Sequence, residues 1–175
     1  MDIDTQAVNV TKLSLLLKVL EGEHRDALEA QQKLFRERAL PDLDDNIKCG
    51  NSLIGPDIYD DHELNLNSDD IHQINPFDWK SEFSEIMNNG GFDAVIGNPP
   101  YVKLHNINKL FLHYFFKNYQ TAEKKCDVYA FFVERVLHNL LKEKGLLGYI
   151  ISDTWLNLDS FNNLRQIVSK KNKNL

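Results

Sequence analysis

The sequence is poor in cysteine and lacks any long apolar run. Its two cysteines, Cys49 and Cys126, are far apart and have no Cys-x-x-Cys spacing, so neither a zinc site nor a disulfide framework is expected. No apolar run reaches the ~20 residues of a membrane-spanning helix, and no signal peptide precedes the first apolar segment. We therefore expect a cytoplasmic protein with no membrane partner and no metal requirement.

Acidic residues outnumber basic ones, but the two kinds of charge occupy different stretches. The chain has 175 residues, is 42% hydrophobic and carries a formal net charge of −6, which allows one buried core and excludes a disordered chain. Residues 57–85 hold nine acids and one lysine, whereas residues 102–125 hold five lysines and one glutamate. The basic stretch fits a phosphate backbone or a solvated helix face, so charge alone does not decide the partner.

Residues 92–101, with the sequence Phe-Asp-Ala-Val-Ile-Gly-Asn-Pro-Pro-Tyr, form the central motif of the chain. Ala94, Val95 and Ile96 predict a short buried strand that ends at Gly97. The strand must end there because two successive prolines cannot donate to a sheet ladder. Loops at the carboxyl ends of parallel strands are the usual ligand sites of open α/β sheets.

The loop after this strand suits the binding of a planar –NH2 group. The Asn98 amide oxygen and the Pro99 carbonyl offer two acceptors, which would orient the amino group and free its lone pair. Tyr101 would stack on the ring that carries the amine, at about 1–3 kcal/mol per base. A proline-stiffened turn with a surface tyrosine explains the same residues equally well.

The motif resembles that of S-adenosylmethionine-dependent amino methyltransferases. More narrowly, the chain is similar to TaqI-type adenine-N6 DNA methyltransferases, including the methylase part of type IIG restriction–modification enzymes. The run from Asp127 to Leu156, with Thr154-Trp155-Leu156 after a strand, is similar to the same pattern. The resemblance implies that Asn98, Pro99, Pro100 and Tyr101 are catalytic, and that Tyr101, Val102 and Lys103 contact the substrate.

The resemblance also implies a site for the cofactor S-adenosyl-L-methionine. In the family, the strand-end acid of an acidic-Ile-Asp triplet binds the ribose, and Asp2 and Ile3 occupy that position. From the residues alone, Asp2 is better explained as a charge that favours the start of a helix. Asn51, with Ser52 beside it, matches the residue that contacts the cofactor adenine, and asparagine keeps an acceptor there without the charge.

Periodicity predicts the remaining elements. Helices are expected over residues 5–20, 23–39, 79–87, 106–119, 127–143 and 160–168, and strands over 47–53, 92–97 and 146–151. The aromatic residues of the 106–119 helix could meet nucleic acid, but their helical spacing favours core packing. Helices alternating with apolar strands predict an α/β fold, which the resemblance specifies as a three-layer, Rossmann-like methyltransferase fold with a mostly parallel sheet.

Parts of a complete enzyme of this kind are missing from the sequence. The Gly-rich turn that would cradle the methionine part of the cofactor is absent, as are a second aromatic strand and a target-recognition domain. We therefore expect residues 1–175 to be a partial catalytic domain that is incomplete at its N-terminus. Its partners would be double-stranded DNA with a flipped adenine and the remainder of a larger restriction–modification enzyme.

The function expected from the resemblance is transfer of a methyl group to adenine N6 in a restriction–modification or related defence system. A protein glutamine amide or an RNA base also presents a planar –NH2 and is the first alternative. The second alternative is an inert remnant without methyl transfer, which the missing Gly-rich turn favours.

Overall fold

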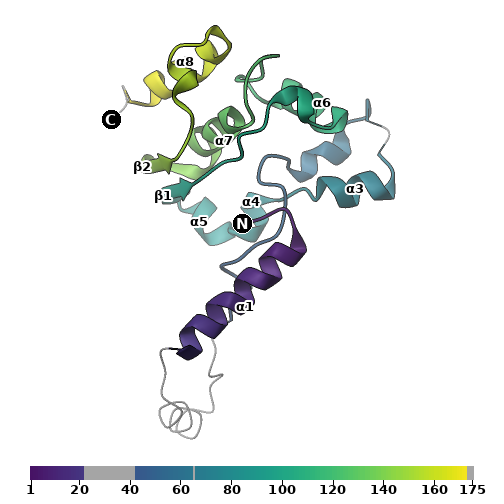
Figure 1. Cartoon of the computed structure of the whole chain (residues 1–175), viewed down its shortest axis with the longest axis vertical. Helices are drawn as coiled ribbons and strands as arrows, with labels where there is room; N and C mark the ends of the chain where they lie inside the picture. Colours follow the sequence, from purple (N-terminus) through teal and green to yellow (C-terminus); the bar gives the residue numbers. More distant parts are fainter. Residues whose placement is uncertain (22–41, 65, 173–175) are drawn as a thin grey trace, which may run out of the picture. The chain divides into compact units, whose positions relative to one another are not determined.

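The computed structural model describes residues 1–21, 42–64 and 66–172. The chain divides into two compact units, Met1–Asn51 and Ser52–Leu175 (Figure 1). The helix expected over residues 23–39 lies outside the described residues. Among the described residues, no helix is both long and apolar enough to cross a membrane.

The first unit is built on helix α1, Thr5–Glu21, which confirms the expectation from apolar spacing. Asp4 precedes the helix, and its carboxylate accepts a hydrogen bond from the backbone N–H of Gln6 at 2.7 Å. Such a bond satisfies one of the donors that every helix start leaves open. Farther along the helix, the Lys12 ammonium lies 2.6 Å from the Asp44 carboxylate.

The strand expected over residues 47–53 is wrong. The described residues of this segment form isolated bridges instead of a strand, and one of them is the parallel bridge between Asp2 and Cys49. The Asp2 N–H donates to the Lys48 carbonyl at 3.3 Å, and the Gly50 N–H donates to the Asp2 carbonyl at 2.8 Å. A strand needs a neighbour along its whole length, and here two hydrogen bonds to one residue replace the ladder.

The second unit alternates short helices with two strands (Figure 1). In chain order its elements are η1 (Pro56–Asp60), α3 (Ser68–Ile74), α4 (Trp79–Glu82), α5 (Ser84–Asn88), β1 (Phe92–Gly97), η2 (Leu104–Asn106), α6 (Lys109–Asn118), α7 (Tyr129–Arg135), η3 (Val136–Leu140), β2 (Leu141–Tyr149), η4 (Asp153–Leu156), η5 (Asp159–Phe161) and α8 (Asn162–Asn172). The structure is therefore mixed α/β, as the sequence predicts.

The helix expected over residues 79–87 is interrupted at Phe83, which separates α4 from α5. Phe83 has φ −127° and ψ 45°, outside helical geometry. Its ring stacks on Trp79 at a centroid distance of 5.7 Å and meets the edge of Phe92 at 5.5 Å. The break lets Phe83 join an aromatic cluster against the base of β1, and such ring pairs stabilise by about 0.5–1.5 kcal/mol beyond burial.

Strands β1 and β2 pair in parallel, and α7 lies beside them as part of the connection between the strands (Figure 1). Val95 pairs with Leu147, and Gly97 pairs with Tyr149. The carboxyl ends of both strands therefore lie at the same edge of the sheet. This edge is where the motif loop leaves β1.

The helix expected over residues 127–143 is too long, and the strand expected over 146–151 starts earlier. Helix α7 gives way to the π-helical turn η3, and β2 already begins at Leu141. Leu141 pairs with Phe92, and the register then shifts before the ladder resumes at Leu146. Leu141 therefore belongs to the strand, although its apolar spacing also continues that of the helix.

The two faces of the sheet have different environments. Val95, Leu147 and Tyr149 pack against buried residues of η3. The opposite face carries Ile96, 86% exposed, and Leu146, 71% exposed. The expectation that both strands are buried is therefore wrong for this face, because no described residue of the second unit covers it.

The core of the second unit gathers aromatic side chains from α6 and α7. Phe131 is fully buried, with its ring centroid 4.7 Å from that of Phe115 and 5.2 Å from that of Tyr119. On the same helix as Phe115, Phe116 remains 48% exposed. The aromatic helix expected over 106–119 therefore serves mainly as core, as its spacing favours.

The last helix, α8, confirms the expectation over residues 160–168 and continues to Asn172. Leu164 and Ile167 bury its inner face, at 1% and 6% exposure. Immediately before the helix, the ring of Phe161 stacks on Tyr129 at a centroid distance of 5.4 Å and an interplanar angle of 8°. This stack places Tyr129 behind the motif loop.

Candidate functional site

The motif loop leaves the sheet where β1 ends, as the paired prolines predict. The Ile150 N–H donates to the Gly97 carbonyl at 3.2 Å, which is the last backbone bond between the strands' continuations. Beyond it, Asn98 is exposed and Pro99 is buried. Among the described residues, none hydrogen-bonds to the Asn98 amide or to the Pro99 carbonyl. Neither acceptor is therefore used in a hydrogen bond within the described part of the chain.

Tyr101 is fixed at its hydroxyl but open on its ring. The hydroxyl donates to the Ile150 carbonyl at 2.9 Å, a bond that contributes about 0.5–1.5 kcal/mol net. The ring lies 6.2 Å from the Tyr129 ring and remains 53% exposed. A ring that is held at one end and half open can act as a stacking platform.

Tyr129 lies within the helix expected over residues 127–143, and its ring lies against that of Tyr101. The Tyr129 hydroxyl lies 3.2 Å from the Thr154 hydroxyl, which lies 3.0 Å from that of Ser152. Burial raises the pKa of Tyr129, so its hydroxyl stays protonated and able to donate. The segment after β2 thus contacts Tyr129, which in turn contacts Tyr101 of the motif loop after β1. The printed sequence offers one hint of this role, the Thr154-Trp155 that follows the strand.

The residues after Tyr101 are attached to the start of α7. The Val128 N–H donates to the Val102 carbonyl at 2.9 Å, and the Lys103 ammonium lies 3.2 Å from Oδ1 of Asp127. Asp127 is 8% exposed, so its charge depends on this lysine for compensation. The expected substrate contacts Val102 and Lys103 therefore lie directly beside Tyr101 in a fixed segment.

Cys126 precedes this attachment point and is buried, at 1% exposure. Burial raises the pKa of its thiol from 9.0 to about 11. We expect iodoacetamide at pH 8 to modify Cys126 about 100-fold more slowly in the folded chain than in the urea-unfolded chain, because the thiolate is the reactive form. The rate should rise about tenfold per pH unit toward pH 11. Mass spectrometry of the peptide measures this, and equal rates in both states would contradict it.

The expected cofactor residues lie at the start of the chain and at the boundary of the two units. In the first unit, the backbone bonds of Asp2 to residues 48 and 50 bring Asp2 next to the segment that ends at Asn51. Oδ1 of Asp2 accepts from the Asp4 N–H at 2.9 Å. In the second unit, the Ser52 carbonyl accepts from the Trp79 indole N–H at 3.1 Å. The role of Ile3 stays a prediction.

A group of carboxylates and a histidine in the second unit has the spacing of a metal site. Asp61, Glu63 and His113 place one ligand atom each within 4.8 Å of one another. The Lys117 ammonium, however, already lies 3.0 Å from Oδ2 of Asp61, the oxygen that also meets His113 at 3.1 Å. The hydrogen bond from Lys117 holds the pKa of Asp61 below its usual value. We interpret the group as an ion-pair network that attaches α6 to residues 61–63.

The parallel pairing of β1 and β2, with the Asn-Pro-Pro-Tyr loop at the carboxyl edge, is consistent with the resemblance to methylases. Comparison with known proteins agrees: residues 1–175 match the family described as Eco57I restriction-modification methylase, and the chain belongs to this family. The resemblance found in the sequence is thereby confirmed.

Two of the following relatives are type II enzymes, and a third is an adenine-specific methyltransferase. RM.Eco57I of Escherichia coli, a type II restriction enzyme and methyltransferase, is 36% identical over 172 residues, which are 97% of this chain and 15% of the relative. The type II methyltransferase M.PaeR7I of Pseudomonas aeruginosa is 38% identical over 82 residues, 47% of this chain and 14% of the relative. The adenine-specific methyltransferase PglX of Lacticaseibacillus casei is 35% identical over 78 residues, 45% of this chain and 6% of the relative. The chain thus spans a small part of these relatives.

Proposed function

We propose that this chain is part of the catalytic domain of a DNA methyltransferase that modifies adenine at N6. The observation that carries the proposal is the motif loop after a parallel strand. It holds the exposed Asn98 amide, the Pro99 carbonyl without a hydrogen-bond partner among the described residues, and the anchored but half-exposed ring of Tyr101. The family supports DNA methylation, and the adenine-specific relative supports the base.

The side chains of the loop have distinct roles in this proposal. Adenine leaves the duplex, because its amino group cannot be reached inside the helix. Oδ1 of Asn98 and the Pro99 carbonyl each accept a hydrogen bond from the N6 amino group. These two bonds orient the amino group and direct its lone pair away from the ring. Tyr101 stacks on the base, and Pro100 keeps the loop rigid between the acceptors and the ring. Val102 and Lys103 then border the base-binding position.

S-adenosylmethionine supplies the methyl group when it is bound. The residues that we assign to it have suitable chemistry, since a carboxylate accepts hydrogen bonds from ribose hydroxyls and an amide can pair with an adenine edge. Oδ2 of Asp2 has no hydrogen-bond partner among the described residues. Asp2 and Ile3 would hold the ribose, and Asn51 and Ser52 the adenine ring.

We further propose that the two strands belong to a larger, mostly parallel sheet, which is the middle layer of a three-layer fold. The support is the apolar, exposed face of the sheet, where Ile96 is 86% exposed and Ile150 is 71% exposed. Apolar residues of parallel strands are normally covered on both faces. Other parts of a longer restriction–modification enzyme would cover the exposed side chains of Ile96 and Ile150.

The test is an analysis of the methylated product. A reconstituted longer enzyme that contains this chain is incubated with methyl-labelled S-adenosylmethionine and duplex DNA, and the digested nucleosides are identified by mass spectrometry. N6-methyldeoxyadenosine is the expected product. Preferential labelling of RNA or of a glutamine peptide in the same assay would contradict DNA as the substrate. No label in any substrate would identify the chain as an inert remnant.

A further inference from the structure

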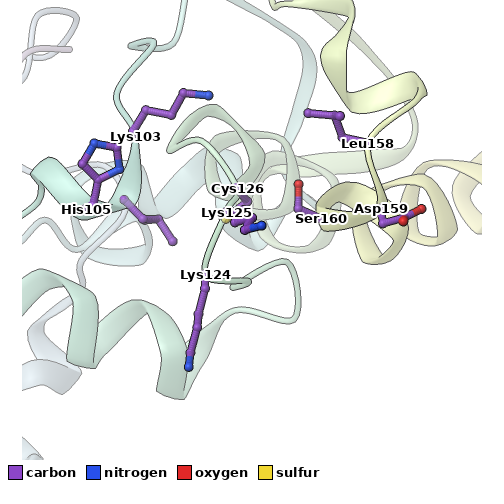
Figure 2. Close-up of a pocket in the computed structure, with 9 residues that line it drawn as sticks. Lys103, His105, Lys124, Lys125, Cys126, Leu158, Asp159 and Ser160 are labelled. Carbon is purple, nitrogen blue, oxygen red and sulfur yellow. The ribbon is translucent and has the colours of Figure 1, made fainter.

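A basic groove lies next to the motif loop and shares Lys103 with it, whereas the other lining residues have no role in the methyl transfer described above. It encloses about 490 Å³ and is lined by three segments, residues 103–105, 124–126 and 158–160. Figure 2 shows Lys103 and His105 on one side, Leu158 and Asp159 on the other, and Lys125 and Ser160 between them. All three segments belong to the second unit.

The groove is locally positive in an acidic protein. Three of its lining residues are lysines, whereas the chain as a whole has a formal net charge of −6. Lys103 is paired with Asp127, but Lys124 and Lys125 are exposed and form no ion pair with a described residue. Asp159 is the one acid of the lining. Two uncompensated ammonium groups therefore face solvent here.

The position of the groove links it to the base-binding loop. Lys103 follows Tyr101 by two residues, and two residues of extended chain span at most about 7 Å. The opposite wall, residues 158–160, follows η4, whose Thr154 supports Tyr129 behind Tyr101. The loops after β1 and β2 thus form both the base platform and the walls of the groove.

We infer that this groove binds the sugar-phosphate backbone of the strand whose adenine occupies the motif loop, with Lys124 and Lys125 neutralising its phosphates. The inference rests on the proposed function, because it takes the Asn98 loop as the place of the base. An elongated polyanion suits cations spread over two separate segments, residues 103–105 and 124–126, better than a small anion does. Each phosphate that a protein neutralises releases condensed counterions, which makes the affinity salt-dependent.

The salt dependence gives the expected effect. The slope of log K against log salt is about −0.9 per neutralised phosphate for duplex DNA and about −0.7 for a single strand. Removing two lysines should therefore make the slope less steep by about 1.4–1.8. We expect the affinity at low salt to fall by about tenfold or more, since counterion release dominates non-specific binding.

The experiment measures fluorescence anisotropy of a labelled duplex oligonucleotide with the full 175-residue chain, over a series of salt concentrations. The double variant Lys124→Ala/Lys125→Ala is compared with the matched control Lys170→Ala/Lys171→Ala, which removes the same charge from α8. Neither control lysine forms an ion pair with a described residue. Thermal unfolding of all variants shows whether each is folded, and Lys124→Arg/Lys125→Arg should restore binding.

A loss of affinity and of salt slope in the groove variant, with the control near wild type, supports the inference. Equal losses in both variants, no binding by the wild-type chain, or displacement of the DNA by polyglutamate at equal charge would overturn it. Formation of N6-methyldeoxyadenosine without groove binding would overturn the groove alone, whereas groove binding without methylation of any substrate would overturn the proposed function alone.

Discussion

Replacing Asn98 with alanine will lower the rate of methyl transfer to adenine by about 100-fold or more. The change removes one of two acceptors for the amino hydrogens and leaves the strand and prolines that position the loop unchanged. Preorganised hydrogen-bonding groups at a reacting centre typically contribute 10²–10³ in rate. The loss should appear in kcat more than in KM, because the acceptors act most strongly on the amino group as it becomes nucleophilic.

Two further variants make this result interpretable. Asn98→Asp keeps an acceptor oxygen at the same place and should retain more activity than the alanine variant. Asn139→Ala, an exposed asparagine of η3, should leave the rate unchanged. Activity of Asn98→Ala equal to that of the wild type would remove Asn98 from the proposed mechanism.

The motif strand and its loop could be predicted from local sequence because local chemistry determines them. Gly97 and the two prolines end the ladder wherever the strand lies, so β1 occupies the expected residues 92–97. Helix α1 follows in the same way from its apolar period and a capping acid. These features depend on neighbours within a few residues.

The end of α7 could not be predicted for the opposite reason. Leu140 and Leu141 continue the apolar period of the helix and also begin an apolar strand, so both assignments fit the local pattern. Pairing with Phe92, which lies far away in the sequence, decides in favour of a strand at Leu141. Tertiary contact thus overrides local propensity.

Burial of the sheet also depends on distant residues. Ala94, Val95 and Ile96 form an apolar run that is typical of a strand covered on both faces. The structure covers Val95 but leaves Ile96 86% exposed. The apolar run predicts that other residues pack on the face that carries Ile96, but it does not identify which segment supplies them.

The side-chain hydrogen bonds of α7 also could not be predicted from the sequence. Glu134 lies in an apolar helix stripe and would be assigned to a surface, yet it is 4% exposed. Its carboxylate accepts bonds from the Thr121 N–H and hydroxyl at 2.8 and 2.7 Å and from the Gln120 N–H at 2.9 Å. A single sequence shows neither these bonds nor the Tyr129–Thr154 contact, because they join turns and helices through side-chain geometry.

Replacing Phe131 with alanine will lower the free energy of unfolding by about 3–5 kcal/mol. Phe131 is fully buried between Phe115 and Tyr119, so its removal loses apolar burial and leaves a cavity among rings that cannot easily close it. Urea denaturation followed by tryptophan fluorescence measures the change. Because small domains have about 5–15 kcal/mol of stability, we expect the variant to approach the unfolding threshold.

Graded and matched variants keep this prediction measurable. Phe131→Leu retains most of the volume and should cost about half as much or less. Phe116→Ala removes the same ring from a 48% exposed position on α6, where surface changes usually stay within about 0.5 kcal/mol. Equal effects of the alanine changes at 116 and 131 would contradict the aromatic core. A large effect at 131 alone would mean that α6 and α7 share a specifically packed aromatic core.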